Sequence, residues 1–140
     1  MRRGNQPDQG REAGPGRDRG ANPVELTVLL PAILILLLAS VQAAAWFLAR
    51  ATALNAAQEA VNAQRAYRAA DGVGQRRAEE FITRAGDWLT GARVTVRPGT
   101  TQVSATVTGQ PLRIVPLIPL PAVSETAHGT VERVTPEPPR

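Results

Sequence analysis

The sequence has 140 residues with a net charge of +4, and 43% of its residues are hydrophobic. It contains no cysteine, which excludes disulfides, thiol catalysis and thiolate metal sites. Its 16 basic residues are scattered among 12 acidic ones, with no basic face beside stacking aromatic side chains, so the charge does not indicate a nucleic-acid partner.

Residues 1–20 form a polar leader that is rich in glycine and arginine. The leader holds five arginines and three acidic residues, with almost no apolar side chains. Because such a segment cannot bury enough apolar surface to fold, we expect it to be disordered. The proline-rich residues 135–140 are likewise expected to form a disordered tail.

Residues 21–50 are predicted to form a transmembrane segment whose span covers residues 26–49. The stretch Leu26–Ala49 is 24 residues long, carries no charge and has 20 apolar residues. As a helix it would reach about 36 Å, enough for a hydrocarbon core of about 30 Å. More arginines precede the span than closely follow it, so the positive-inside rule places the N-terminus in the cytoplasm and residues 51–140 outside. We therefore expect a single-pass protein of the cytoplasmic membrane.

Residues 51–70 continue the helix beyond the span as an amphipathic segment, and no helix breaker separates the two. The spacing therefore predicts one helix over residues 23–70, ended by Asp71–Gly74. Its polar face carries asparagine, glutamate and arginine, and its buried face is predicted to hold Ala53, Leu54, Ala57, Ala60, Val61, Gln64 and Tyr67.

The rest of the chain predicts a small sheet behind a second helix. That helix covers residues 75–90, with Ala78, Phe81, Ile82, Ala85 and Leu89 facing inward. Residues 93–97 and 102–108 alternate around Pro98-Gly99, which predicts a hairpin, and residues 123–134 are a third candidate strand. Residues 51–134 are thus expected to form an extracytoplasmic α+β head.

Residues 111–121 combine four prolines with leucines and isoleucines. Because proline is disfavoured in helix interiors and central strands, we expect the segment to form neither. Two interpretations remain open. In one, the segment is an apolar loop folded over the sheet to complete a thin core. In the other, it is an exposed patch that docks a partner or the membrane surface, with the candidate contact residues Pro111, Leu112, Ile114, Val115, Leu117, Ile118 and Leu120.

The junction before the span has two interpretations as well. Asn22 suits a helix N-cap, Pro23 suits the first turn, and Glu25 completes a capping box. The same residues resemble a prepilin-type cleavage site, because a basic leader, a glycine and a glutamate five residues later precede an apolar helix. That resemblance implies cleavage between Gly20 and Ala21 by a prepilin peptidase, with Glu25 pairing with the new amine of a neighbouring subunit.

The region around residues 17–70 also resembles the N-terminal region of TadE-like proteins, small pseudopilins of bacterial tight-adherence (Flp) pilus assembly and secretion systems. The matching features are Arg19-Gly20, Val24-Glu25, Leu30-Pro31, Trp46-Phe47 and the Ala/Asn/Gln/Glu-rich helix beyond. The resemblance implies a pilin-like fold and partners among pilin subunits or membrane proteins of the assembly machinery. No cofactor is expected, because the residues form no metal cluster or phosphate-binding loop. Small residues spaced four apart within the span are candidates for close helix packing: Ala39, Ser40, Ala43 and Ala44.

Two other functions stay open. One is a signal-anchored cell-surface binding module unrelated to pili, and the other is a soluble secreted protein cut after Ala45. An enzyme is not expected, because no nucleophile–base–acid set, metal cluster or phosphate loop is visible. The lone His128 does not share a strand face with Glu125, and the charges Glu79 and Glu80 beside arginines indicate a solvated helix face.

Overall fold

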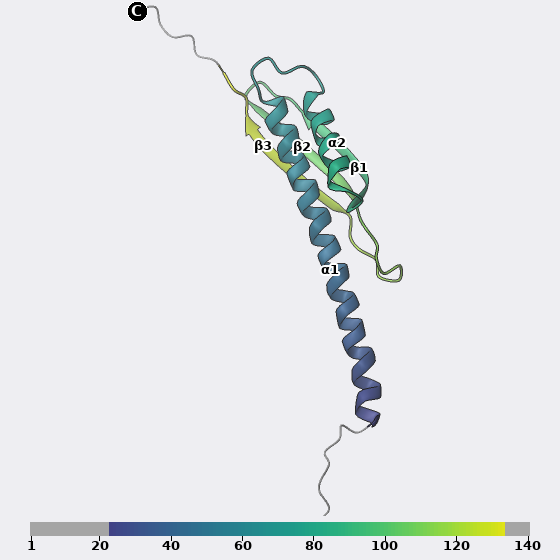
Figure 1. The fold of residues 1–140 in the computed structure, drawn as a ribbon. Coiled ribbons are helices and arrows are strands. Elements are labelled where there is room, and N and C mark those ends of the chain that lie inside the picture. The colour runs from purple at the N-terminus through teal and green to yellow at the C-terminus, as the bar shows by residue number, and fades with distance from the viewer. Residues whose placement is uncertain (1–22, 134–140) are drawn as a thin grey trace, which may run out of the picture. The chain divides into compact units, whose positions relative to one another are not determined.

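The computed structural model describes residues 23–133, with side chains from Leu26 onward (Figure 1). The elements in chain order are α1 (Pro23–Gln64), α2 (Val73–Ala85), β1 (Leu89–Arg97), β2 (Gln102–Pro111) and β3 (Val123–Thr130). The predicted α+β class, with a long helix, a short helix and three antiparallel strands, is confirmed. The predicted disordered leader and tail lie outside the described residues.

The chain divides into two compact units between Leu34 and Ile35, and α1 contributes to both. The described part of the first unit is the beginning of α1. Its large apolar side chains are all exposed: Leu26, Val28, Leu29, Leu30, Ile33 and Leu34. Pro31 lies within the helix without ending it. An apolar surface of this kind, exposed on all sides, requires a non-aqueous environment or a partner.

In the second unit, α1 packs on the sheet through a stripe of alanines. The buried side chains recur every three or four residues, as one face of a helix requires: Ala45, Ala49, Ala53, Ala56, Ala57 and Ala60. Because alanine is small, the helix axis approaches the sheet closely. The opposing side chains are Val103, Ala105 and Val107 of β2, and all three are buried.

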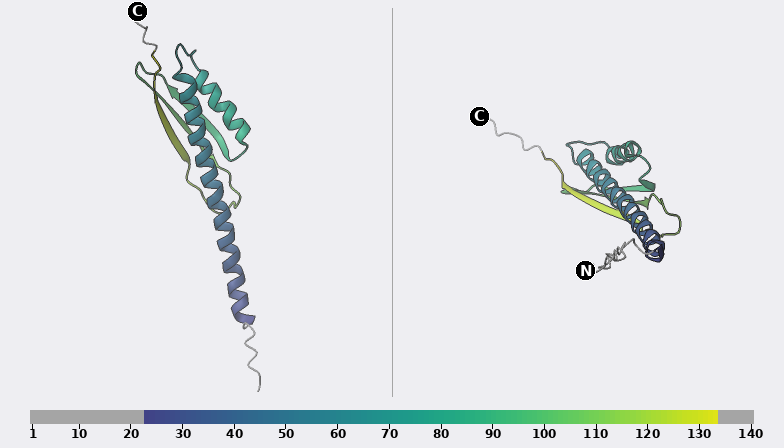
Figure 2. Two further views of the ribbon diagram at one scale, coloured as in Figure 1. Left: turned by 60° about the vertical axis from the view of Figure 1, so that its left-hand side comes forward. Right: turned by 60° about the horizontal axis from the view of Figure 1, so that its bottom comes forward.

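The sheet has the strand order β1-β2-β3, with antiparallel pairs throughout. Both helices lie on one of its faces (Figure 2), and the other face is polar, as expected of an antiparallel sheet with one covered side. On the polar face the Thr106 and Thr126 hydroxyls are 2.9 Å apart and hydrogen-bonded. The β1–β2 pairing shifts between Thr90 and Arg93. Gly91, with φ of 59°, supplies the left-handed residue of this bulge.

Helix α1 ends at Gln64, six residues before its predicted end. The cause is a tertiary contact. The Arg65 carbonyl accepts a hydrogen bond from the Glu132 N–H, in the segment after β3, at 3.0 Å, and not from the next turn of a continued helix. The Ala69 N–H instead bonds to the Ala66 carbonyl at 3.0 Å, and the chain turns. The prediction that Tyr67 is buried is therefore wrong, because its side chain is 53% exposed.

The second helix begins two residues earlier and ends five residues earlier than predicted. It begins at Val73 and ends at Ala85, since Gly86 adopts φ of 87°. Leu89, predicted on this helix, is buried as the first residue of β1. Gly74, predicted as part of the helix stop, lies inside α2. There a Cβ would come within 2.5 Å of the Ala60 carbonyl oxygen, so glycine allows the two helices to meet.

The three strands also differ in length from their predictions. The first two are longer than predicted, because the bulge interrupts the alternation of β1 and because β2 continues to the buried Pro111. The third strand ends at Thr130, four residues early, where the chain leaves the sheet to reach α1.

Candidate membrane anchor and assembly surface

Within residues 23–133, α1 is the one helix long and apolar enough to cross a membrane. In the most apolar stretch of this helix, only 11% of the residues are buried inside the protein. The core helix of a soluble protein would instead be mostly covered by its own chain. The first half of α1 is thus available to lipid or to other helices.

Aromatic and charged side chains mark the end of this apolar stretch. The rings of Trp46 and Phe47 meet edge to face with centroids 5.1 Å apart, and the guanidinium carbon of Arg50 lies 5.8 Å from the Trp46 centroid. Arg50 Nε donates to Glu125 Oε1 at 2.6 Å, which joins α1 to β3. Tryptophan and arginine are the side chains typical of a membrane–water interface.

Gln42, one turn before Trp46, is the most deeply buried polar side chain of α1, with 2% of its surface exposed. Its Oε1 accepts two backbone hydrogen bonds, from Ile114 N at 3.2 Å and from Val115 N at 3.0 Å. The sequence analysis did not single out Gln42, which is one of the few residues of Leu26–Ala49 that are not apolar. A polar side chain inside an apolar span was the available signal.

The loop between β2 and β3, residues 112–122, is the apolar loop of this protein. Three of its large side chains are exposed: Ile114 by 44%, Leu117 by 92% and Ile118 by 38%. The interpretation that the segment completes the core is therefore wrong for these three residues. Leu112, Val115 and Leu120 are half-buried, and Pro111 is buried at the end of β2.

The predicted cleavage and assembly residues fall partly outside this description. Gly20 and Ala21 lie outside the described residues, and Glu25 lies in the first turns of α1, where side chains are not described. The predicted packing residues Ala39, Ser40, Ala43 and Ala44 are all exposed on α1. The Ser40 hydroxyl donates to the Leu36 carbonyl of its own helix at 2.8 Å, so its hydrogen bonding is local.

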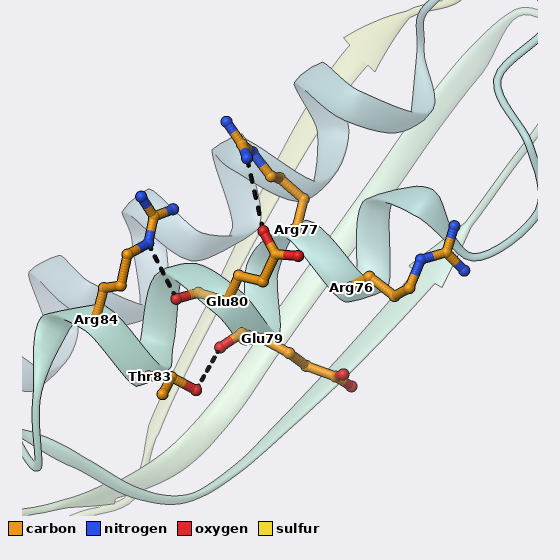
Figure 3. A pocket seen from close by; sticks show the side chains of 6 residues that line it. All are labelled: Arg76, Arg77, Glu79, Glu80, Thr83 and Arg84. Atoms are coloured by element: carbon orange, nitrogen blue, oxygen red, sulfur yellow. Dashed lines mark hydrogen bonds and ion pairs between the residues drawn. The ribbon is translucent and has the colours of Figure 1, made fainter.

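Charged side chains on α2 border an open surface hollow, which Figure 3 shows. Arg77 contacts Glu80 at 3.6 Å and Glu59 of α1 at 3.5 Å, and these side chains are largely exposed. The arrangement is the solvated helix face that the sequence predicts. Among residues 23–133 no three metal-binding side chains gather. Glu125 faces α1 whereas His128 lies on the exposed side of β3.

A comparison with protein families gives one match. Residues 23–62 match the model of a family described as TadE-like protein. The matched residues lie entirely within α1 and include none of α2 or the sheet. No curated protein and no solved structure matches the sequence.

Proposed function

Because residues 23–62 match the model of the TadE-like family, we propose that the chain is a TadE-like protein, a single-pass, pseudopilin-like component of a bacterial tight-adherence pilus assembly or secretion system. The main support for the proposal is that the residues that match the family are those of α1. From Leu26 to Ala49 the same helix carries no charge, and its large apolar side chains are mostly exposed. An anchor that must also contact neighbouring helices has this form.

The proposed location is the cytoplasmic membrane, with the leader inside the cell and residues 51–134 forming a domain outside. The support is the charge distribution: five arginines precede the span, and Arg50, Arg65 and Arg68 are the basic residues that follow within about twenty positions. The aromatic pair Trp46-Phe47 then falls at the outer interface, where such residues are enriched.

The proposed assembly surface is the first half of α1. Ala39, Ser40, Ala43 and Ala44 are small and exposed, so another helix can approach the backbone closely there. A carboxylate near lipid is costly without a partner, so Glu25 is suited to pair with the amine of a neighbouring subunit after cleavage at Gly20–Ala21. The role is structural rather than catalytic, and it requires no cofactor.

The experiment that tests anchoring and processing is N-terminal sequencing of the mature protein, recovered separately from membranes and from culture medium. An Ala21 start in the membrane fraction supports cleavage by a prepilin peptidase. Pro23 lies close to the bond to be cut, so an intact Met1 in membranes is the outcome that would remove the peptidase from the proposal. A chain in the medium starting at Trp46 would overturn the membrane assignment.

The role of Glu25 is tested by Glu25→Ala, with Glu59→Ala as the control. Glu59 lies beyond the apolar stretch and is partly exposed. We expect Glu25→Ala to leave the leader cleaved but to block pilus assembly, measured by electron microscopy and by sheared surface protein. The control should assemble normally. Normal pili with Glu25→Ala would reduce this residue to a helix cap.

A further inference from the structure

We propose that the apolar loop, residues 112–122, inserts into the lipid bilayer beside α1 and forms a second membrane contact. The proposal rests on the proposed function in that α1 spans a membrane. In Figures 1 and 2 this loop extends past the ends of β2 and β3. Its depth, composition and hydrogen bonding each support insertion.

The depth follows from Gln42, which holds the loop. Its Oε1 binds the backbone N–H groups of Ile114 and Val115, so this part of the loop lies against α1 at that turn. A bilayer core is spanned by about 20 helical residues. Counted from Leu26, that length ends near Ala45, beyond Gln42. The loop backbone is therefore fixed at the level of the hydrocarbon boundary.

The side chains of the loop suit lipid and not water. Leu117 is 92% exposed, and Ile114 and Ile118 are also exposed. On the neighbouring α1, Leu38, Val41, Phe47 and Leu48 are exposed as well. The loop and the helix thus present apolar surface at the same level. The bilayer is the proposed occupant because this surface adjoins the exposed apolar side chains of α1 that the proposed anchoring places in lipid, among them Leu37 and Leu38.

The backbone of the loop is adapted to an apolar surrounding, in which an unpaired N–H is costly. Three of its eleven residues, Pro116, Pro119 and Pro121, have no N–H. Four others donate their N–H groups within the protein. Ile114 and Val115 donate to Gln42, Leu112 to the Trp88 carbonyl at 3.1 Å, and Ile118 to the Val115 carbonyl at 3.3 Å.

The charges near the loop match the headgroup layer. Residues 112–122 contain no acidic residue, and their one charge is the exposed Arg113. Arg50, two turns after Gln42, is paired with Glu125 at 2.6 Å, so Arg113 is the cation available to the headgroup layer. Arginine side chains placed there can extend to lipid phosphates while their stems stay in the apolar layer.

The test uses the absence of native cysteine. The full chain with Leu117→Cys is labelled with an environment-sensitive fluorophore and reconstituted into vesicles of phosphatidylcholine and phosphatidylglycerol. Thr100→Cys, exposed in the β1–β2 turn at the other end of the sheet, is the matched control. We expect the label at 117 to emit at shorter wavelength, and to be quenched several-fold more by lipids with a quencher on the acyl chain.

Equal emission and quenching at positions 117 and 100 would overturn the proposal. The measurement is repeated at rising dilution of protein into lipid, since protection that disappears on dilution would assign the loop to a second copy of the chain and also overturn it. Vesicle flotation is measured on the same samples. Protein that floats with an unprotected loop refutes this inference alone, whereas protein that fails to float refutes the proposed anchoring too.

Discussion

At the scale of single residues, the most informative side chain is Gln42, which joins α1 to the apolar loop. Its amide oxygen accepts two backbone N–H groups, whereas its Nε2 is buried without a partner in the part of the chain that the structure describes. Burying an amide in apolar surroundings is costly unless hydrogen bonds compensate. The two hydrogen bonds to the loop backbone compensate part of this cost.

We expect Gln42→Met to release the loop, because methionine has a similar length but provides no strong acceptor. Loss of the two hydrogen bonds should cost about 1–3 kcal/mol. Amide hydrogen exchange at Ile114 and Val115 should then accelerate by roughly 5- to 150-fold, measured by mass spectrometry in detergent micelles. Ser40→Ala is the control, since that hydroxyl bonds only within its own helix among the described residues. Unchanged exchange in Gln42→Met would contradict the assigned role.

The ion pair between Arg50 and Glu125 is the second residue-scale link between α1 and the sheet. The two arginines are about equally exposed, at 53% for Arg50 and 52% for Arg77, but the Glu125 side chain is 18% exposed whereas that of Glu59 is 42% exposed. The Arg50–Glu125 distance of 2.6 Å is also shorter than the 3.5 Å between Arg77 and Glu59. Exposed pairs contribute about 0.2–1 kcal/mol. We expect a double-mutant cycle to place the Arg50–Glu125 coupling at the top of that range.

The cycle uses Arg50→Ala and Glu125→Gln, with unfolding of the full chain in detergent followed by tryptophan fluorescence. A parallel cycle on Arg77 and Glu59 should give a coupling close to zero, because solvent screens that pair. Equal couplings for the two pairs would show that burial of Glu125 adds nothing to the attraction.

At the scale of elements, the contact between α1 and α2 depends on Gly74. A Cβ at this position would meet the Ala60 carbonyl oxygen at 2.5 Å and Gln64 Cβ at 3.0 Å. Gln64 also bridges the turn, since its Oε1 accepts the Gly74 N–H at 3.1 Å and its Nε2 donates to the Ala70 carbonyl at 3.3 Å. The two helices are thus held at a separation that only glycine permits.

We therefore expect Gly74→Ala to destabilise the fold by about 1–3 kcal/mol, although alanine is the better helix former. The clash involves backbone, which cannot move aside as a flexible side chain can. Chemical denaturation of the full chain in detergent measures the effect. Gln75→Ala, at the exposed neighbouring position, is the control and should stay within about 0.5 kcal/mol of the native chain. A stabilising Gly74→Ala would mean that the helices are free to separate.

Local sequence patterns predict some features of these helices and strands and not others. Periodicity predicted α1 and the hairpin around Pro98-Gly99, because both depend on local pattern. It missed the end of α1, since the Arg65 carbonyl is taken by Glu132, a residue distant in sequence. It placed Leu89 on a helix because the bulge at Gly91 breaks the strand alternation. The roles of Gln42 and Glu125 depend on partners more than 70 positions away, which no local pattern contains.

At the scale of the whole chain, three regions of different chemistry follow one another. The leader holds five of the 16 arginines, the stretch Leu26–Ala49 holds no charge, and the remainder is polar with an exposed hydroxyl-bearing sheet face. The first and third regions suit water and the middle one suits lipid, so the order of the regions along the chain limits how it can be placed across a membrane. Orientation is then the property of the whole molecule that most needs measurement.

We expect residue 100 to face the outside of the cell. In intact cells, a membrane-impermeant maleimide should label Thr100→Cys. Asn22→Cys, which stays in the mature chain whether or not the leader is removed, should be labelled only after permeabilisation. The physical cause is the excess of leader arginines, which favours retention of the N-terminal side in the cytoplasm. Replacing the leader arginines by glutamine should therefore lower the fraction of chains with residue 100 outside. Labelling of Asn22→Cys in intact cells would show the opposite orientation.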